Sequence, residues 1–271
     1  MYNTGIDVSE HNGVIDWEEI RRAGIAFAII RLGWGRGHLD RLFYEHINGA
    51  LAAGLPVGVY YYSYADTPKA AEDEAWFTVH VLTDCGLSPE KLPLGVWYDM
   101  EDADGWKAAR GLVEPSRITA MCGAYVDSLK SAGYLAGVYA SYDWLTRMIF
   151  PERALSCPFW CAQWGRTCDF PEAFLWQYTD QLDIGGHRLD GDRVLGPGIS
   201  EGISLMETDC LAERSMGGSP VACMVPDREM ARGSAAILDR ASYSLNGSVH
   251  SHTTSHRSLK RMIPSSVRSL R

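Results

Sequence analysis

Two carboxylates stand two positions apart, Asp99 and Glu101, directly after an apolar run at residues 94–98. Side chains two apart on a β-strand point to one face, so a strand here would hold these carboxylates about 6–7 Å apart at Cβ. Mutual repulsion raises the pKa of one member of such a pair. The protonated member can donate to a glycosidic oxygen while its ionised neighbour stabilises positive charge. The alternative is the solvated start of a loop through residues 102–104; the position behind an apolar strand favours the chemistry.

Further acidic, aromatic and amide side chains fall on the other apolar runs. We expect Asp7 and Asp190 to complete an acidic site around the first pair. The candidate substrate-binding residues are Arg31, Tyr60, Tyr62, Tyr139, Trp160 and Gln177. Asp7 could instead cap a helix or pair with Arg31, Asp190 could be a turn residue, and the two tyrosines could be partly core. Acids and aromatic rings gathered at one edge suit carbohydrate cleavage, because the C–H faces of a pyranose stack on aromatic rings.

The histidines and cysteines do not point to other chemistry. The eight His and seven Cys residues show no metal-ligand spacing. No Cys–His arrangement suggests nucleophilic catalysis. We therefore expect structural free thiols and no metal site built from these residues.

The elements that must position these residues alternate along the chain. Four times a glycine ends an amphipathic stretch and a strand-like apolar run follows; these runs are residues 25–30, 57–62, 94–98 and 135–139. Helices are expected over residues 68–84 and 115–132, each beginning with proline. The acids at residues 72–74 suit the dipole at the start of the first of these helices. This alternation is typical of α/β units around a parallel sheet.

Four more strands bring the number of strand candidates to eight: residues 6–9, 159–164, 175–179 and 188–194. Five candidates have α/β character, and three come late with little room for helices between them. The fold class is therefore α/β, an irregular TIM-like (β/α)5β3 barrel over residues 1–197, with functional groups at the carboxyl ends of its strands. Residues 198–271 are rich in Ser, Gly, Arg and His, and beyond Asp239 every charged residue is basic. We expect a poorly ordered tail, either inert or binding anionic polymers.

The net charge and the hydropathy of the sequence limit the kinds of binding partner that we expect. The net charge of −9 argues against nucleic acid as the main partner. No apolar run is long enough to predict a membrane span. The first residues show no signal-peptide pattern, so we expect synthesis in the cytoplasm. We also expect a monomer.

The order of these motifs resembles glycoside hydrolase family 25, the Chalaropsis-type lysozymes that include many phage endolysins. The resemblance covers about residues 4–195, and a single motif would be weak evidence whereas the ordered set is strong. The matching segments are Gly5-Ile6-Asp7-Val8-Ser9, Ile15-Asp16-Trp17, Ala28-Ile29-Ile30-Arg31, Asp40 through Phe43, residues 53–60, Tyr98-Asp99-Met100-Glu101, Trp160-Cys161-Ala162, Trp176-Gln177-Tyr178-Thr179 and Leu189-Asp190-Gly191-Asp192.

The resemblance implies a flattened barrel that cleaves the β-1,4 bond between N-acetylmuramic acid and N-acetylglucosamine in peptidoglycan. Glu101 would be the general acid. Asp99 would orient and stabilise a reaction in which the 2-acetamido group of the substrate acts as nucleophile, and Asp7 and Asp190 would complete the acidic floor. No cofactor is implied. The enzyme would act on the bacterial cell wall, which favours a holin-dependent endolysin or another export route.

Two other functions fit the same scaffold. A non-catalytic peptidoglycan-binding module would be expected to lack one of the four acids, and all four are present. A glycosidase on another N-acetylated polymer, such as chitin, would differ only in its sugar contacts. The chain also departs from the family pattern where Tyr61 replaces a histidine and Asp192 replaces an asparagine. Both departures bear on sugar contacts and leave every catalytic carboxylate in place.

Overall fold

The computed structural model describes residues 4–149 and 155–195. Its strands are β1 (Thr4–Val8), β2 (Phe27–Trp34), β3 (His38–Leu39), β4 (Val57–Tyr62), β5 (Val96–Asp99), β6 (Ala136–Ser141), β7 (Phe159–Ala162), β8 (Ala173–Ile184) and β9 (His187–Val194). Its helices are α1 (Trp17–Arg22), α2 (Phe43–Ala52), α3 (Pro68–Asp84), α4 (Pro115–Ser131) and α5 (Tyr142–Arg147), with short 3-10 helices η1 (Glu10–Asn12), η2 (Pro89–Lys91) and η3 (Ala108–Arg110). The expected tail and its boundary at residue 197 lie outside the described residues.

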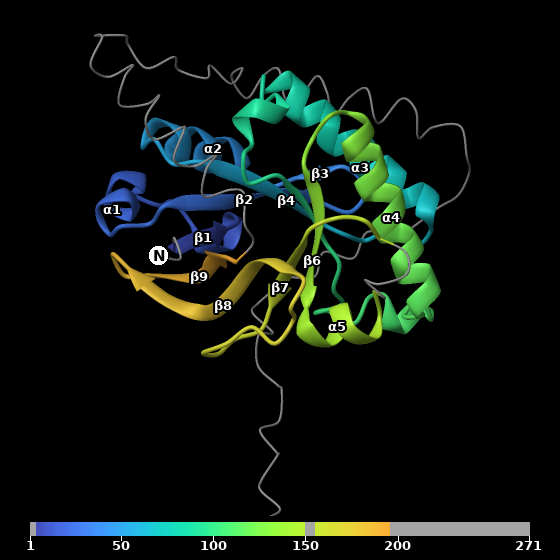
Figure 1. Ribbon diagram of the computed structural model, residues 1–271. Coiled ribbons are helices and arrows are strands. Elements are labelled where there is room, and N and C mark those ends of the chain that lie inside the picture. Colours follow the sequence, from blue (N-terminus) through green and yellow to red (C-terminus); the bar gives the residue numbers. More distant parts are fainter. Residues whose placement is uncertain (1–3, 150–154, 196–271) are drawn as a thin grey trace, which may run out of the picture. The chain divides into compact units, whose positions relative to one another are not determined.

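The strands close into a barrel, as expected (Figure 1). The sheet runs in the order β1-β9-β8-β7-β6-β5-β4-β2-β3, and β1 also pairs with β2, which closes the ring and leaves β3 outside it. An α-helix follows each of β1, β2, β4, β5 and β6 in the chain, with η1, β3 and η3 intervening after β1, β2 and β5, and none of the described helices lies between the last three strands. The (β/α)5β3 prediction is therefore confirmed, and the hairpin strand β3 is an addition to it.

The expectation of a parallel sheet is wrong at one strand. The pairs from β1 through β2, β4, β5, β6, β7 and β8 are parallel, but β9 is antiparallel to both β8 and β1. The short turn at Gly185 and Gly186 explains this direction, because it leaves no room for a crossover between β8 and β9. The first half of β9 therefore lies at the carboxyl edge of the other strands, where Asp190 is the register partner of Asp7.

Alternation along β5 separates the interior from the outer layer. Trp97 packs inside the barrel with Phe27, Ile29, Leu94, Trp160 and Leu175. Tyr98 points the other way and stacks on Tyr125 of α4, with 3.9 Å between ring centroids. The interior cluster is apolar and lies beneath the carboxylates, so the acidic residues stand on a packed core.

Glu74 of α3 corrects the interpretation of that helix's acidic start. Thr67 caps the helix by accepting a hydrogen bond from the Ala70 amide, and Glu74 is buried against the sheet. Its carboxylate accepts hydrogen bonds from the Tyr98 hydroxyl (2.6 Å) and the Tyr64 amide (2.9 Å). Burial raises the pKa of Glu74 to about 7. Glu74 therefore ties α3 to the ends of β4 and β5 instead of serving the helix dipole.

Two further properties concern only residues 4–149 and 155–195. No helix there is long and apolar enough to cross a membrane. The cysteines described as free thiols are Cys85, Cys122, Cys157, Cys161 and Cys168.

Candidate active site

The carboxylate pair lies at the carboxyl end of β5. The ladder continues past Asp99, because the Met100 amide donates to the Tyr139 carbonyl (2.9 Å) and the Ser63 amide donates to the Asp99 carbonyl (3.0 Å). The backbone carrying the pair is therefore held from both neighbouring strands. The charge of Glu101 acts on Asp99, Tyr62 and Tyr139, which places Glu101 at the same end of the barrel.

Asp99 is a buried carboxylate with an unused acceptor. It is 5% exposed, and its Oδ1 accepts no hydrogen bond from any residue in the described part of the chain. Burial, followed by the charge of Glu101, raises the pKa of Asp99 well above its usual range, while Lys107 and Arg31 oppose that rise. An unsatisfied buried acceptor is costly. A ligand that donates a hydrogen bond at this point would remove that cost.

Gln177 of β8 connects the aromatic and acidic sides of the site. Its amide Nε2 donates to Asp7 Oδ2 (2.8 Å) and, at 3.5 Å, to Asp190 Oδ2. Its Oε1 accepts from the Tyr139 hydroxyl (3.1 Å) and the Trp164 indole N–H (3.2 Å). Both the nitrogen and the oxygen of the Gln177 side-chain amide therefore form hydrogen bonds within the protein. This residue orients the carboxylates of Asp7 and Asp190.

Asp192 is an acid that the sequence marked only as a departure from the family pattern and not as a catalytic residue. It is 0% exposed, and its Oδ1 accepts a hydrogen bond from the Trp160 indole N–H (2.9 Å). Burial and then the charge of Asp7 raise its pKa well above the usual range. Alternation could have revealed it, because residues 190 and 192 share a face of β9.

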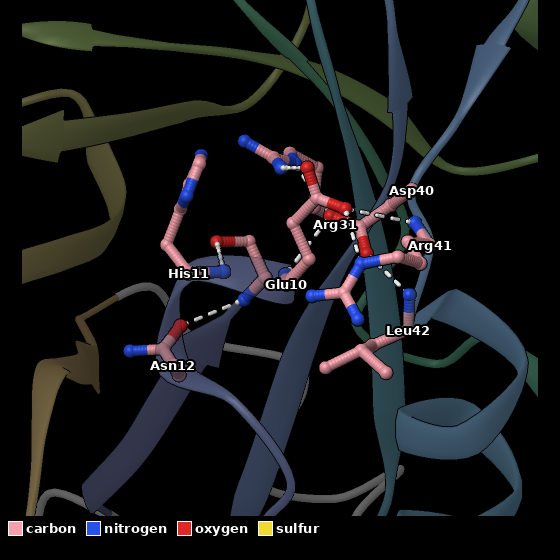
Figure 2. Close-up of polar contacts among 8 residues, drawn as sticks. Glu10, His11, Asn12, Arg31, Asp40, Arg41 and Leu42 are labelled. Carbon is pink, nitrogen blue, oxygen red and sulfur yellow. Dashed lines mark hydrogen bonds and ion pairs between the residues drawn. The ribbon is translucent and has the colours of Figure 1, made fainter. Parts of the chain in front are cut away.

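Arg31 lies within β2, three residues before its last residue, and contacts the acidic side chains of Asp40 and Glu10 (Figure 2). Its Nε donates to Asp40 Oδ2 (2.7 Å), and its Nη2 lies 3.4 Å from Glu10 Oε1. Asp40 also accepts from the Glu10 and Leu42 amides. These contacts with Asp40 and Glu10 hold the Arg31 guanidinium in place. Arg31 ties η1 to the segment before α2, and its charge still reaches Asp99.

The predicted aromatic residues divide between the core and the edge of the barrel. Trp160 is 1% exposed and packs on Tyr139 and Tyr60, with ring centroids 4.6 and 6.1 Å apart, so it supports the site from below. Tyr60, Tyr62 and Tyr139 are partly buried. Trp164, which sequence reasoning missed, is 56% exposed although its indole N–H reaches Gln177. Direct contacts of these residues with a sugar stay predictions.

Lys107 is another residue that sequence reasoning missed. It follows the carboxylate pair by six positions and is 1% exposed. Its ammonium group donates to the carbonyls of Ser63 (2.5 Å) and Glu101 (2.9 Å). No periodicity in the segment signalled its burial, because residues 100–107 form an irregular loop whose path depends on tertiary contacts.

The arrangement combines an acid pair with cations and aromatic rings, and it contains no cluster suited to a metal. Among the described residues, no group of three or more His, Cys, Asp or Glu side chains could hold a metal ion. Asp7, Asp99, Glu101, Asp190 and Asp192 are brought to one end of the barrel, with Arg31 and Lys107 as the nearby positive charges. Such a set can transfer a proton and stabilise a developing cation.

Comparison with known proteins identifies relatives of this arrangement. A family model described as glycosyl hydrolases family 25 matches residues 6–187. The chain is 26% identical over 196 residues to "Lysozyme M1" of Streptomyces globisporus and 28% identical over 203 residues to the "Autolytic lysozyme" of Clostridium acetobutylicum, covering 70% and 73% of this chain. The chain spans 66% and 56% of the lengths of these two curated relatives.

A solved structure gives the same result. The modular autolysin LytC from Streptococcus pneumoniae, determined in complex with a synthetic peptidoglycan ligand, superposes with a TM-score of 0.61 at 25% identity. The match covers 72% of this chain and 47% of that one.

Proposed function

The chain belongs to glycosyl hydrolase family 25, and on that premise we propose that it is a muramidase. It cleaves the β-1,4 bond between N-acetylmuramic acid and N-acetylglucosamine in peptidoglycan. The observation that carries this proposal is Asp99, a buried carboxylate with an unused acceptor next to Glu101. The family and the lysozyme and autolysin relatives support peptidoglycan as the substrate.

Glu101 supplies the proton in the first step. Its carboxyl group protonates the glycosidic oxygen, and the bond from that oxygen to C1 of the muramic acid breaks. Glu101 is less buried than Asp99 and follows the last residue of β5, which suits a group that must reach a leaving oxygen. The ionised Glu101 then removes a proton from the water that attacks C1, which restores the acid.

Asp99 acts on the 2-acetamido group of the same sugar. The acetamido oxygen attacks C1 as the glycosidic bond breaks, and the nitrogen of the resulting ring acquires positive charge. Asp99 Oδ1 accepts the hydrogen bond from that N–H and stabilises the charge. This role explains why a costly unsatisfied acceptor is retained in the free protein.

Asp7 and Asp190 form the acidic floor of the proposed site, and the charge of Asp7 acts on Asp99. Gln177 fixes both carboxylates through its amide group. Their negative charge attracts and stabilises the oxocarbenium-like cation that develops on the sugar. Arg31, Tyr60, Tyr62, Tyr139 and Trp160 are the proposed surroundings of the sugar, with Trp160 acting from beneath it.

The place of action follows from the substrate. The peptidoglycan of the bacterial wall lies outside the membrane, so we infer that the protein reaches it through a holin or another export route and works there as a monomer.

Digestion of purified peptidoglycan tests the proposal. New reducing ends of muramic acid are expected, whereas reducing-end glucosamine or no release would refute muramidase activity. Glu101→Gln should lower turnover by about 10³-fold or more, the scale of losing a general acid, with binding to insoluble peptidoglycan retained. Glu172→Gln makes the same chemical change at an exposed residue and should keep normal activity. Near-normal turnover by Glu101→Gln would show that another group is the acid.

A further inference from the structure

The loop after β5 is fastened by a buried lysine. Lys107 is 1% exposed, although lysine is seldom fully buried without a partner. Its Nζ donates to the Ser63 carbonyl at 2.5 Å, just after β4, and to the Glu101 carbonyl at 2.9 Å. One ammonium group therefore joins the end of β4 to the residue proposed as the general acid.

Two tyrosine rings and the Asp102 carboxylate also contact Lys107. Its ammonium lies 5.7 and 5.8 Å from the ring centroids of Tyr62 and Tyr64, within the range of cation–π attraction. Asp102 accepts hydrogen bonds from the Lys107 amide (2.6 Å) and the Ala108 amide (2.9 Å), which fixes the turn that brings the side chain back under the carboxylate pair. Hydrogen bonds from both the backbone amide and the side chain of Lys107 therefore fix the path of this loop.

The charge of Lys107 has a consequence for the pair. When Asp99 and Glu101 share one proton, burial favours placing that proton on Asp99, the deeper residue, because a buried carboxylate prefers to be neutral. The proposed reaction needs the opposite distribution, with Asp99 ionised and Glu101 protonated. Lys107 is the strongest of the influences that favour ionised Asp99, ahead of Arg31.

We propose that Lys107 is a positioning residue for this reaction: it holds the backbone of Glu101 against the end of β4, and its buried positive charge keeps the proton of the pair on Glu101. The inference rests on the proposed function, since it concerns the same two carboxylates. Lys107 itself is too buried to contact a sugar.

Other titratable groups surround the two charges and define the background of any pH experiment. Those acting on or near Asp99 are Glu101, Lys107, Asp7 of β1, Arg31 of β2, Tyr60 and Tyr62 of β4, and Tyr139 of β6. Those near Lys107 are Asp99, Glu101, Asp102, Glu74 of α3, Tyr62, Tyr64 and Cys122 of α4. Substitution of Lys107 leaves all of them in place, so a changed profile can be assigned to the lysine.

Lys107→Met, which keeps an unbranched side chain of the same length as the aliphatic part of lysine and removes the charge, tests the proposal. Hydrolysis of purified peptidoglycan glycan strands is measured from pH 3 to 9, with kcat and KM separated. The acidic limb reports the ionisation of Asp99, and loss of a neighbouring cation raises the pKa of that group. We expect the limb to move to higher pH by about one unit and kcat to fall about tenfold or more, with KM within about twofold.

Two further lysine variants make the outcome decisive. Lys107→Arg keeps the charge, so its acidic limb should stay at the wild-type pH even if kcat falls. Lys91→Met is the matched control, because Lys91 also donates to a backbone carbonyl, that of Gly86, but is exposed and distant in the chain; its profile should equal that of the wild type. An unmoved limb in Lys107→Met would overturn the proposal, as would a limb that moves equally in Lys107→Arg.

Folding and the underlying activity are checked separately. Lys107→Gln provides a second neutral variant, and circular dichroism establishes which variants fold. If both neutral variants unfold while Lys107→Arg folds, the lysine is an anchor of the fold alone and the proposal fails. A wild-type protein without activity on peptidoglycan refutes the proposed function itself, whereas an active wild type with an unmoved limb in Lys107→Met refutes only the role of Lys107.

Discussion

Replacing Asp192 by asparagine should stabilise the protein at neutral pH. Asp192 is fully buried, and when it is ionised its Oδ2 accepts no hydrogen bond from the described residues, because the neighbouring Asp7 carboxylate can share a hydrogen bond with it only when one of the two acids is protonated. Asparagine keeps the oxygen that accepts from Trp160 and places an NH₂ donor where the second carboxylate oxygen stood. Removing one unsatisfied buried acceptor is worth about 1–3 kcal/mol, so we expect a gain of about 2 kcal/mol in the free energy of unfolding.

The gain should depend on pH in a defined direction. Burial and the charge of Asp7 raise the pKa of Asp192 in the folded state. A carboxyl group with a raised folded-state pKa contributes stability that is complete below its unfolded pKa of about 4 and is lost as pH rises through the folded value. The asparagine that replaces it does not titrate. The difference between Asp192→Asn and the wild type should therefore be smaller at pH 4 than at pH 8.

Urea unfolding followed by circular dichroism at pH 4 and pH 8 measures both effects. Asp183→Asn, an identical change at an exposed residue of β8, is the control and should alter stability by less than about 0.5 kcal/mol. Asp192→Ala should instead lose about 1–3 kcal/mol, because the buried indole N–H of Trp160 loses its acceptor. A destabilised Asp192→Asn at pH 8, or a gain of equal size at both pH values, would refute this account of the buried acid.

Two other substitutions test the packing around the barrel. Burial raises the pKa of Glu74 from an ordinary 4.5 to about 7. Its protonated form therefore stabilises the protein at low pH by about 3 kcal/mol, and this contribution is lost as the pH rises from 4.5 to 7. Thermal unfolding of Glu74→Gln should lack that loss of stability, and a variant with the same pH dependence as the wild type would contradict the assignment. Gly137→Ala would place a methyl group 2.5 Å from both the Pro158 carbonyl oxygen and Trp97. We expect it to lower the free energy of unfolding in urea by about 1–3 kcal/mol. The control is Gly123→Ala on α4, whose nearest contact would be at 3.4 Å and which should not lower that free energy.

The parts of the fold that depend on local sequence patterns could be predicted from the sequence. Glycines 24, 54, 86 and 133 have positive φ angles and come after helices, as their spacing predicted. Alternation along β5 correctly placed Trp97 inside the barrel and Tyr98 outside it. The direction of β9 was not predicted, although the turn residues Gly185 and Gly186 were visible, because strand patterns are the same in both directions.

The parts that escaped prediction depend on contacts distant in sequence. Lys107 is buried because its ammonium group finds a carbonyl 44 positions away, at Ser63, which no local pattern encodes. Glu74 lies among acids that suit a helix start, and its hydrogen bonds with the Tyr98 hydroxyl and the Tyr64 amide show that it faces inward. Arg31 donates a hydrogen bond to Asp40, nine positions along the chain, and no local pattern indicated this pairing. Charged residues without periodicity are therefore the residues whose partners are hardest to predict.

The partners of the carboxylates distinguish their roles more sharply than their positions do. Gln177 orients Asp7 and Asp190, and Trp160 binds one oxygen of Asp192. Asp192 and Asp99 both have a buried oxygen that accepts no hydrogen bond from the described residues, but Asp192 is fully enclosed while Asp99 keeps 5% exposure at the end of β5. Only at Asp99 can a donor arrive with a substrate. We therefore expect the buried oxygen of Asp192 to lower stability, whereas that of Asp99 can be satisfied as the acetamido nitrogen of a substrate gains charge.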